Sequence, residues 1–338
     1  MAETMKALVY NPEGLDKMTW ATNFSVPEIS SNEFLVKTTA TSLNPFDFRV
    51  TESASMFTGY KNTPVGCDMA GTIVKIGKNV EGFQVGDKVF GWGAGLAEFC
   101  VSDPTRIAKI PPGKKPPEDF SIFPCVAVTA WQLLHKYWIA KPGFQVSSIA
   151  VMGAAGAVGS CLIQMARDLG GPELEIFALS SPKNEEYLKS IGASHFIDYS
   201  SSRFDISKSA IPEKSVDLII DLVSGISEDN FVANAMCLIR PNTGKYITLN
   251  TLSSMEDVER KIKTLSGISL SENYDLFMVH RIGSSRDLGE IANMVADGKL
   301  KLNIAEDLPW NEQAIRSGFN KLKLRHHARG KFRVVISP

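Results

Sequence analysis

The clearest hydrophobic pattern in the chain is a short apolar run, followed by small residues and then by an amphipathic stretch. Residues 149–152 are apolar without interruption, which is typical of a strand buried on both faces of a sheet. After the small residues 153–157, apolar side chains recur at helical spacing from Val158 to Ala166. The pattern predicts a buried strand, a tight turn and a helix in direct succession.

The turn has the spacing of a dinucleotide-binding fingerprint. It reads Ala154-x-Gly156-x-x-Gly159, so alanine stands where the first glycine usually does. Gly156 would let the backbone approach a pyrophosphate held by N–H groups of the helix start, and Gly159 would let the helix pack closely on the strand. The alternative is a tight structural turn without a ligand. The expected cofactor-binding residues of the turn are Ala154, Ala155, Gly156, Ala157 and Val158.

The hydrophobic pattern divides the rest of the chain into a β-rich part and an alternating part. Short runs of β-forming residues such as 5–10 and 33–39, separated by glycine and proline, favour a compact all-β barrel at the start. From residue 149 to about residue 283, strands and helices alternate, which predicts a parallel sheet with helices on both faces. The expected strands there cover residues 175–179, 217–222, 245–249 and 276–280, and the expected helices cover residues 184–191 and 229–239. A buried helix over 124–134 precedes them. Helices over 287–296 and 311–322, a further segment over 300–304 between them, and a strand over 331–336 follow and return to the β domain.

Composition limits the classes of function. At 338 residues the chain is too long for one core of ordinary size, so two domains are expected. Hydrophobic residues make up 44% and charged residues 22%, as in ordinary globular proteins, and the net charge of −1 gives no reason to expect nucleic acid or a membrane surface as partner. The chain has no long apolar run, no signal-peptide pattern and five scattered cysteines, so we expect a cytoplasmic protein with reduced thiols.

Several short motifs together resemble the medium-chain dehydrogenase/reductase superfamily, in particular its zinc-free quinone oxidoreductase branch. They are, in chain order, Asn44-Pro45-x-Asp47, Gly66-x-Asp68-x-Ala70-Gly71, Val85-Gly86-Asp87-Lys88-Val89, Thr129-Ala130-Trp131, the glycine turn at 153–159 and Lys189-Ser190-Ile191-Gly192-Ala193, with Gly330-Lys331-Phe332 near the end. The resemblance implies an α/β protein with two domains and a substrate cleft between them. A GroES-like β-barrel catalytic domain would comprise residues 1–125 and 284–338, and a Rossmann domain with a doubly wound parallel sheet would comprise residues 126–283. We expect a monomer or a homodimer.

The resemblance also raises the question of a catalytic zinc. Asn44 falls where zinc alcohol dehydrogenases have their first ligand cysteine, Cys67 where they have a histidine, and Cys125 where they have the last cysteine. Two thiols could suit a soft metal, but an amide is a poor zinc ligand, and buried cysteines commonly serve as small core residues. We expect no metal here, and the cysteine-rich loop of a structural zinc is missing after Val89.

The resemblance implies three catalytic candidates: Asn44, Asp47 and Arg49. It puts Asn44 beside the nicotinamide ribose and the acceptor oxygen, although an Asn-Pro turn explains the same residue. Asp47 would lie near the floor of the cleft, where it could equally hold the barrel together. Many relatives have Asp-Tyr-Lys where this chain has Asp47-Phe48-Arg49, so a tyrosine proton donor is missing and Arg49 keeps only the charge. His135 and His195 are expected to be solvated or structural.

Cofactor preference follows from the end of the second strand of the alternating part. Enzymes that prefer NAD place a carboxylate there, whereas this chain has Ser180, Ser181 and Lys183, and relatives supply a tyrosine where Tyr199 stands. Hydroxyls and a lysine suit a 2′-phosphate, although a capped helix start at Ser181 explains the same residues. We expect NADPH. Its other contacts would be Leu222 and Val223 on the adenine side, and Leu249 and Val279 near the nicotinamide.

The leading interpretation is therefore an NADPH-dependent oxidoreductase that reduces a small quinone or α,β-unsaturated carbonyl compound without a metal. Such acceptors take a hydride directly, whereas a simple ketone usually needs a Lewis acid or a proton donor. One alternative is a trans-acting enoyl reductase on a carrier-bound acyl chain, with a carrier surface in the basic run Lys321, Lys323, Arg325 and Arg329. Another is an NADPH-binding protein with little catalysis, as among the crystallins of this branch.

Overall fold

The chain forms two compact units in a computed structural model that describes residues 3–11, 13–52, 62–200, 205–223, 234–249, 273–324 and 329–336. One unit comprises Met1–Val128 and His280–Pro338, and the other is the continuous segment Thr129–Val279. The two ends of the chain thus build one unit, and the segment between them builds the other. The boundaries expected at residues 125 and 283 lie a few residues from the observed ones.

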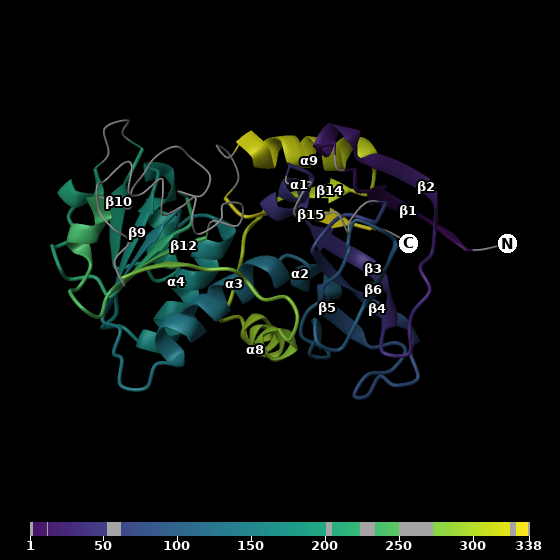
Figure 1. Cartoon of the computed structure of the whole chain (residues 1–338), viewed down its shortest axis with the longest axis horizontal. Coiled ribbons are helices and arrows are strands. Elements are labelled where there is room, and N and C mark those ends of the chain that lie inside the picture. Colours follow the sequence, from purple (N-terminus) through teal and green to yellow (C-terminus); the bar gives the residue numbers. More distant parts are fainter. Residues whose placement is uncertain are drawn as a thin grey trace. The chain divides into compact units, whose positions relative to one another are not determined.

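The second unit is built on a parallel sheet (Figure 1). Within the described residues it has six strands in the order β10-β9-β8-β11-β12-β13, and every pair is parallel. All residues of the central strand β8 are buried, as the uninterrupted apolar run predicts. The strands are β8 (Ser148–Met152), β9 (Glu175–Ser180), β10 (His195–Asp198), β11 (Leu218–Asp221), β12 (Lys245–Thr248) and β13 (Tyr274–Leu276).

Strand order is the feature of this sheet that positions a ligand. The chain proceeds outward from β8 in one direction to β10, then returns to β11 on the other side of β8. In doubly wound sheets a ligand binds where the order reverses, at the carboxyl ends of the strands. The predicted α/β class with an all-parallel sheet is confirmed, and the glycine turn follows the carboxyl end of β8.

Helices of the second unit follow the predicted positions in most places. The helix predicted from its spacing after the turn is α4, and its apolar face is buried from Gly159 to Ala166. The first part of the helix expected over residues 229–239 lies outside the described residues, and the described part, from residue 234 on, contains a short 3-10 helix near its end. The helices are α3 (Pro124–Leu134), η3 (His135–Ile139), α4 (Ala157–Gly170), η4 (Pro182–Asn184), α5 (Glu185–Ser190), η5 (Ile206–Lys208) and η6 (Met236–Leu238).

One strand prediction was wrong. The apolar run from Leu276 to His280 was expected to be a strand, but β13 ends at Leu276. Its partner β12 ends at Thr248, which pairs with Leu276. The N–H group of Phe277 still donates to the Thr248 carbonyl at 2.9 Å, but the register goes no further. Met278 is accordingly 57% exposed.

The first unit is built on a mainly antiparallel sheet that contains both ends of the chain (Figure 1). Among the described residues its strand order is β14-β15-β3-β4-β5-β7, with β6 also paired to β3, and only β14 and β15 run parallel. Arg333 pairs with Ser42, which confirms that the last strand returns to the β domain. The strands are β1 (Thr4–Val9), β2 (Thr19–Ser25), β3 (Phe34–Ser42), β4 (Asp68–Ile76), β5 (Lys88–Trp92), β6 (Phe99–Ser102), β7 (Ile107–Lys109), β14 (Ile304–Pro309) and β15 (Lys331–Val335).

Helices and apolar clusters complete this unit. Phe48 and Phe319 meet edge to face, and they lie in a core cluster that also holds Leu43 and Val334. A second cluster, around Phe34 and the inner residues of β4, fills the other part of the sheet. The helices are η1 (Leu15–Lys17), α1 (Pro45–Glu52), α2 (Pro117–Phe120), α8 (Ser285–Ala296) and α9 (Glu312–Leu324).

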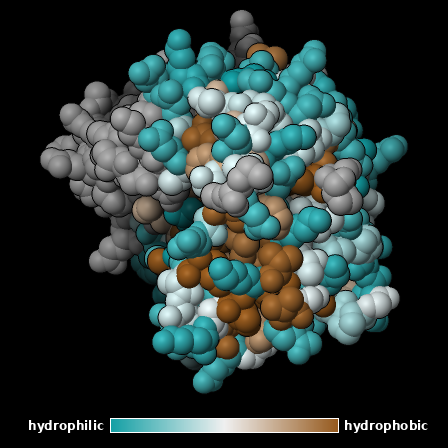
Figure 2. Space-filling view, turned by 90° about the vertical axis from the view of Figure 1, so that its right-hand side faces the viewer, coloured by the Kyte–Doolittle hydropathy of each residue, from teal (hydrophilic) through white to brown (hydrophobic). Residues whose placement is uncertain are grey.

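One face of the molecule carries both polar and apolar side chains (Figure 2). Figure 2 shows one face on which hydrophilic residues surround a central patch of apolar ones. Apolar atoms make up more than half of an ordinary protein surface, so such a patch does not by itself indicate a partner. In the part of the chain that the structure describes, no helix is long and apolar enough to cross a bilayer.

Candidate active site

The glycine turn brings β8 and α4 into close contact. Gly153 has a φ of +75°, and a Cβ added there would lie 2.9 Å from the Cγ2 atom of Val223. At Gly159 a Cβ would lie 2.6 Å from the carbonyl oxygen of Ala154. Because backbone cannot move aside as a flexible side chain can, the first turn of α4 needs glycine at this position.

The start of α4 has the chemistry of an anion-binding site. Gly156 is the N-cap of this 14-residue helix and is exposed, while Ala154 and Ala155 are buried below it. Ala157 and Val158 form the first helical positions and are half-buried. The first N–H groups of a helix have no acceptor within it, and the helix dipole favours negative charge there. The turn therefore fits the pyrophosphate of a dinucleotide.

The residues expected at a 2′-phosphate lie together at the carboxyl ends of β9 and β10. Ser180 ends β9, and its carbonyl accepts a hydrogen bond from the N–H group of Tyr199 at 3.4 Å. Lys183 lies one turn further on, in η4. Asn184, which sequence reasoning missed, donates its amide N–H groups to the hydroxyls of Ser180 at 2.9 Å and Ser181 at 3.1 Å. The position of Asn184 directly after a Ser-Ser-Pro-Lys turn is the feature of the sequence from which this role could have been predicted.

The remaining predicted cofactor residues follow the carboxyl ends of three other strands. The N–H group of Leu222 donates to the carbonyl of Met152 at 3.2 Å, which places Leu222 and Val223 beside the glycine turn. The N–H group of Leu249 donates to the carbonyl of Asp221 at 3.3 Å. Val279 is half-buried and lies shortly after β13.

A buried polar cluster in the first unit holds the leading catalytic candidate. Asn44 is 1% exposed, and its Nδ2 atom donates to Asp68 Oδ2 at 2.7 Å and to the carbonyl of Ser42 at 3.2 Å. Its Oδ1 atom accepts a hydrogen bond of 2.5 Å from Lys331 Nζ. The amide of Asn44 is thus engaged by protein groups at both ends. The resemblance implied that Asn44 contacts the acceptor directly. A role in positioning the cluster fits this geometry better.

Asp68 and Lys331 form the charged centre of this cluster. Asp68 is fully buried, and its Oδ1 atom accepts from the N–H group of Cys125 at 2.7 Å. Its Oδ2 atom accepts from Ser42 Oγ at 2.6 Å and lies 3.3 Å from Lys331 Nζ. Burial lowers the pKa of Lys331, but the Asp68 carboxylate and further neighbours outweigh it, so the pKa is raised above its ordinary value. The pair is therefore a buried ion pair with several additional hydrogen bonds.

Asp47 lies at the edge of the cluster. Its Oδ2 atom accepts a 2.8 Å hydrogen bond from the N–H group of Asn44. Burial, together with the nearby Asp68 charge, raises the pKa of Asp47 to about 7, although the Asn44 N–H group lowers it. Asp47 lines a small hollow whose other residues are Tyr10, Phe46, Pro64, Val65, Gly66 and Arg281. Arg49 belongs to α1, but its side chain lies outside the described part of the chain.

Two of the three positions expected for zinc ligands, Cys67 and Cys125, come together with Asp68 in place of Asn44, but these donors do not fit a zinc ion. The ligand atoms of Cys67, Asp68 and Cys125 lie within 4.8 Å of one another. Burial and the neighbouring Cys125, Asp47 and Asp68 groups raise the pKa of the Cys67 thiol well above its ordinary value, whereas zinc binds the thiolate. The Asp68 oxygens already accept hydrogen bonds, and the Lys331 ammonium adds a positive charge at the same place.

Lys331 was missed as a member of the site. It was noted only as part of the Gly-Lys-Phe ending, and it stands at the start of a strand whose other residues are apolar except for Arg333. A single lysine at 4% exposure in such a strand requires a buried partner. The signal was present in the sequence, but the identity of the partner depends on pairing between β15 and β3.

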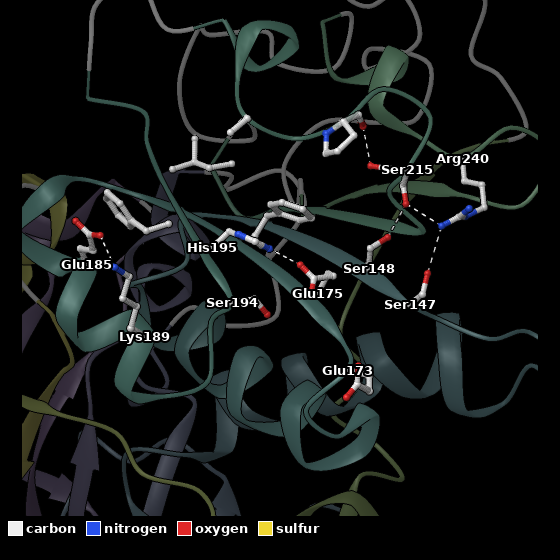
Figure 3. Close-up of a pocket in the computed structure, with 15 residues that line it drawn as sticks. Ser147, Ser148, Glu173, Glu175, Glu185, Lys189, Ser194, His195, Ser215 and Arg240 are labelled. Atoms are coloured by element: carbon white, nitrogen blue, oxygen red, sulfur yellow. Dashed lines mark hydrogen bonds and ion pairs between the residues drawn. The ribbon is translucent and has the colours of Figure 1, made fainter.

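Figure 3 shows a larger hollow at the opposite end of the parallel strands from the glycine turn. Ser148, Glu175 and His195 begin β8, β9 and β10 there. His195 pairs with Glu175 and stacks on Phe177, in keeping with the structural role expected for it. Arg240 donates to the carbonyl of Ser215 at 2.9 Å. Ligands of doubly wound sheets bind at the carboxyl ends, so this hollow is not the cofactor site.

Two family models match the chain. The alcohol dehydrogenase GroES-like domain matches residues 30–113, and a model named zinc-binding dehydrogenase matches residues 191–334. Among curated relatives, the tomato (Solanum lycopersicum) 2-methylene-furan-3-one reductase is 33% identical, over 65% of this chain and 57% of its own length. The zebrafish (Danio rerio) NAD(P)H oxidoreductase RTN4IP1, mitochondrial, is 27% identical, over 95% of this chain and 88% of its own length.

A solved structure extends the fold comparison over nearly the whole chain. The quinone oxidoreductase from Coxiella burnetii has a TM-score of 0.79 at 23% identity, with 99% of this chain and 100% of that chain covered. At this identity the likeness concerns the fold, and the family models and relatives carry the assignment. The chain belongs to the medium-chain dehydrogenase/reductase superfamily of oxidoreductases, whose members use nicotinamide cofactors.

Proposed function

We propose that this protein is an NADPH-dependent oxidoreductase that transfers a hydride to small quinones or α,β-unsaturated carbonyl compounds without a metal ion. The observation that carries the proposal is the carboxyl end of β9. There the hydroxyls of Ser180 and Ser181 and the ammonium of Lys183 stand where a carboxylate would bind a ribose 2′-hydroxyl. A 2′-phosphate is strongly anionic, so hydroxyl donors and a cation suit it.

Two carboxylates of this region, Glu185 and Asp198, have local partners. Glu185 pairs with Lys189 one helical turn away at 2.7 Å. Asp198 accepts hydrogen bonds from the side chain and the N–H group of Ser200, which lower its pKa. Neither arrangement directs a carboxylate toward the hydroxyls at the end of β9, and this favours the phosphate over a ribose hydroxyl.

The proposed acceptors follow from the chemistry of the buried cluster. A bound nicotinamide cofactor supplies the hydride, and a conjugated acceptor is electron-poor enough to take it without a Lewis acid. Its reduction also needs a proton, and Asp47, with a pKa of about 7, can hold one at neutral pH. Asp47 lines a small hollow with Tyr10 and Arg281, which has room for about one water molecule. The names of the tomato and Coxiella proteins agree with this acceptor class.

The carrier-dependent alternative has less support. Of the basic run proposed for a carrier surface, Lys321 is paired with Glu306 at 2.5 Å, and the Lys323 ammonium lies over the Phe48 ring. Arg325 lies outside the described residues. The described lysines of this run therefore already have partners within the chain.

The reaction class is tested by the rate of NADPH oxidation with four acceptors: a quinone, an enal, an enoyl thioester and a simple ketone. The proposal expects turnover with the quinone or the enal and none with the ketone. Preference for the thioester would support the carrier-dependent alternative. Tight NADPH binding without turnover of any acceptor would support the crystallin-like one.

A further inference from the structure

The ammonium of Lys331 has a complete set of hydrogen-bonding partners inside the first unit. Nζ donates to the carbonyl of Leu43 at 3.1 Å and to Asn44 Oδ1 at 2.5 Å, and it lies 3.3 Å from Asp68 Oδ2. An ammonium has three N–H donors, so these three oxygens account for all of them. The side chain is 4% exposed.

The backbone around Lys331 fixes its place. Gly330 has a φ of +114°, and a Cβ there would lie 2.1 Å from the carbonyl oxygen of Asn303. The N–H group of Lys331 donates to the same carbonyl at 2.8 Å. The start of β15 is thus set by glycine and by one hydrogen bond, and the lysine side chain enters the cluster from a fixed point.

The oxygens that hold the ammonium adjoin a soft donor set. Cys67, Asp68 and Cys125 place two thiols and one carboxylate within 4.8 Å of one another. Asn44 Oδ1 is a further oxygen bound to the same ammonium. Two sulfurs and one or two oxygens form a ligand set that Zn²⁺ or Cd²⁺ would accept if the oxygens were available and the thiols could ionise.

The geometry points to Lys331 as a built-in cation that takes the place of a divalent metal in this cluster and keeps such a metal out. The ammonium already occupies Asp68 Oδ2 and Asn44 Oδ1, and its positive charge lies beside the donors that a metal would need, so only one of the two cations can be present. Lys331 also orients Asn44, which makes it a positioning residue. The inference goes beyond the proposed function, since it concerns which cation the cluster holds whatever the acceptor is.

The test is metal binding by a folded variant. Wild-type protein and Lys331→Met are dialysed against Zn²⁺, and against Cd²⁺ in parallel, and bound metal is measured by elemental analysis. We expect no stoichiometric site in the wild type and one metal per chain in Lys331→Met, with affinity at least about 100-fold higher, because one buried positive charge has been removed. Cadmium–thiolate absorption should appear in the variant alone, and Zn²⁺ should raise the Tm of the variant alone.

Two controls locate the effect. Adding Cys67→Ser and Cys125→Ser to Lys331→Met should abolish metal binding, because both sulfur ligands are gone. Lys321→Met removes an exposed lysine that pairs with Glu306 and should leave the protein without a stoichiometric metal, like the wild type.

Three results would overturn the inference. The first is a wild-type protein that binds one zinc per chain at comparable affinity. The second is a folded Lys331→Met that binds none. If Lys331→Met does not fold, Lys331→Gln replaces it, and failure of both to fold even with Zn²⁺ present would show that a metal cannot take the place of the ammonium.

Discussion

The Nζ atom of Lys331 lies 2.5 Å from the Oδ1 atom of Asn44, although 287 positions separate the two residues in the chain. The contact joins the last strand of the first unit to the loop after β3. It also explains why Asn44, the residue most strongly implied as catalytic, is almost fully buried. Its amide keeps a buried ammonium and a buried carboxylate in place.

Replacement of Asn44 by alanine should therefore lower both stability and activity. Lys331 would lose an acceptor and Asp68 a donor, each in a buried place, so the free energy of unfolding should fall by about 1–3 kcal/mol. We expect kcat/KM to fall roughly 10- to 100-fold as the cluster shifts. Asn79→Ala, which removes an exposed hydrogen bond to Asn32, serves as the control and should change stability by less than about 0.5 kcal/mol. An Asn44→Ala variant as stable as the wild type would contradict this account of the cluster.

Lys183 should decide between the two nicotinamide dinucleotides. Lys183→Ala removes the cation proposed for the 2′-phosphate, so the Kd for NADPH should rise about 10- to 150-fold while the Kd for NADH changes little. Lys208→Ala removes a lysine paired with Asp205 in the same unit and should affect neither constant. Isothermal titration calorimetry with NADPH and with NADH measures these Kd values for the wild type and both variants. Equal affinities of the wild type for NADPH and NADH, within a factor of two, would refute the assignment.

Two glycines in helices allow a matched test of the turn. A Cβ at Gly159 would lie 2.6 Å from the Ala154 carbonyl oxygen, whereas a Cβ at Gly289 in α8 would meet nothing within 4 Å. Gly159→Ala should therefore destabilise the protein by about 1–3 kcal/mol and weaken dinucleotide binding. Gly289→Ala should stabilise it by about 0.5–1 kcal/mol, because alanine has the higher helix propensity. Thermal unfolding measures the Tm of both variants. If the two substitutions shift the Tm in the same direction, the close packing at Gly159 is contradicted.

Asp47 should make stability depend on pH. In the folded protein its pKa is about 7, against an ordinary value of 3.8, so between these values only the unfolded chain loses the proton. The wild type therefore loses stability as pH rises from about 4 to about 7, and the loss is complete above that range. Asp47→Asn removes this titration. The free energy of unfolding of the variant, relative to that of the wild type, should therefore rise by on the order of 2 kcal/mol between pH 5 and pH 8.

A control and a contrary result sharpen this prediction. Asp16→Asn, at an exposed position, should leave the pH dependence of Tm unchanged. If the Tm difference between Asp47→Asn and wild type is the same at pH 5 and pH 8, the carboxyl of Asp47 does not titrate in that range.

The features that could be predicted from the sequence are local. The strand, turn and helix around Gly156 follow from three successive patterns within 18 residues, from 149 to 166, and α3 was expected with the bounds that it has. The grouping of Ser180, Lys183 and Tyr199 was also accessible, because parallel strands bring their carboxyl ends to one edge.

The features that could not be predicted depend on pairing between distant segments. The Lys331 ammonium meets Asn44 and Asp68 only because β15 pairs with β3 and β3 with β4. The segment expected over residues 300–304 was misplaced, since strand β14 covers Ile304–Pro309. The sequence of this strand has little alternation, and it pairs with β15 at the edge of the sheet. The prediction of a strand over residues 276–280 was wrong because it, too, depended on a distant segment. The apolar pattern extends past the end of the partner strand β12.

Transfer of deuterium from labelled NADPH tests the central claim most directly. The protein is incubated with a conjugated enone, NADPH carrying deuterium at both positions of the hydride-donating carbon, and a metal chelator. We predict one deuterium at the β-carbon of the saturated product, with the same rate with and without the chelator, and no reaction with an unconjugated ketone. Loss of turnover in chelator, or a product without deuterium, would contradict metal-free hydride transfer to a conjugated acceptor.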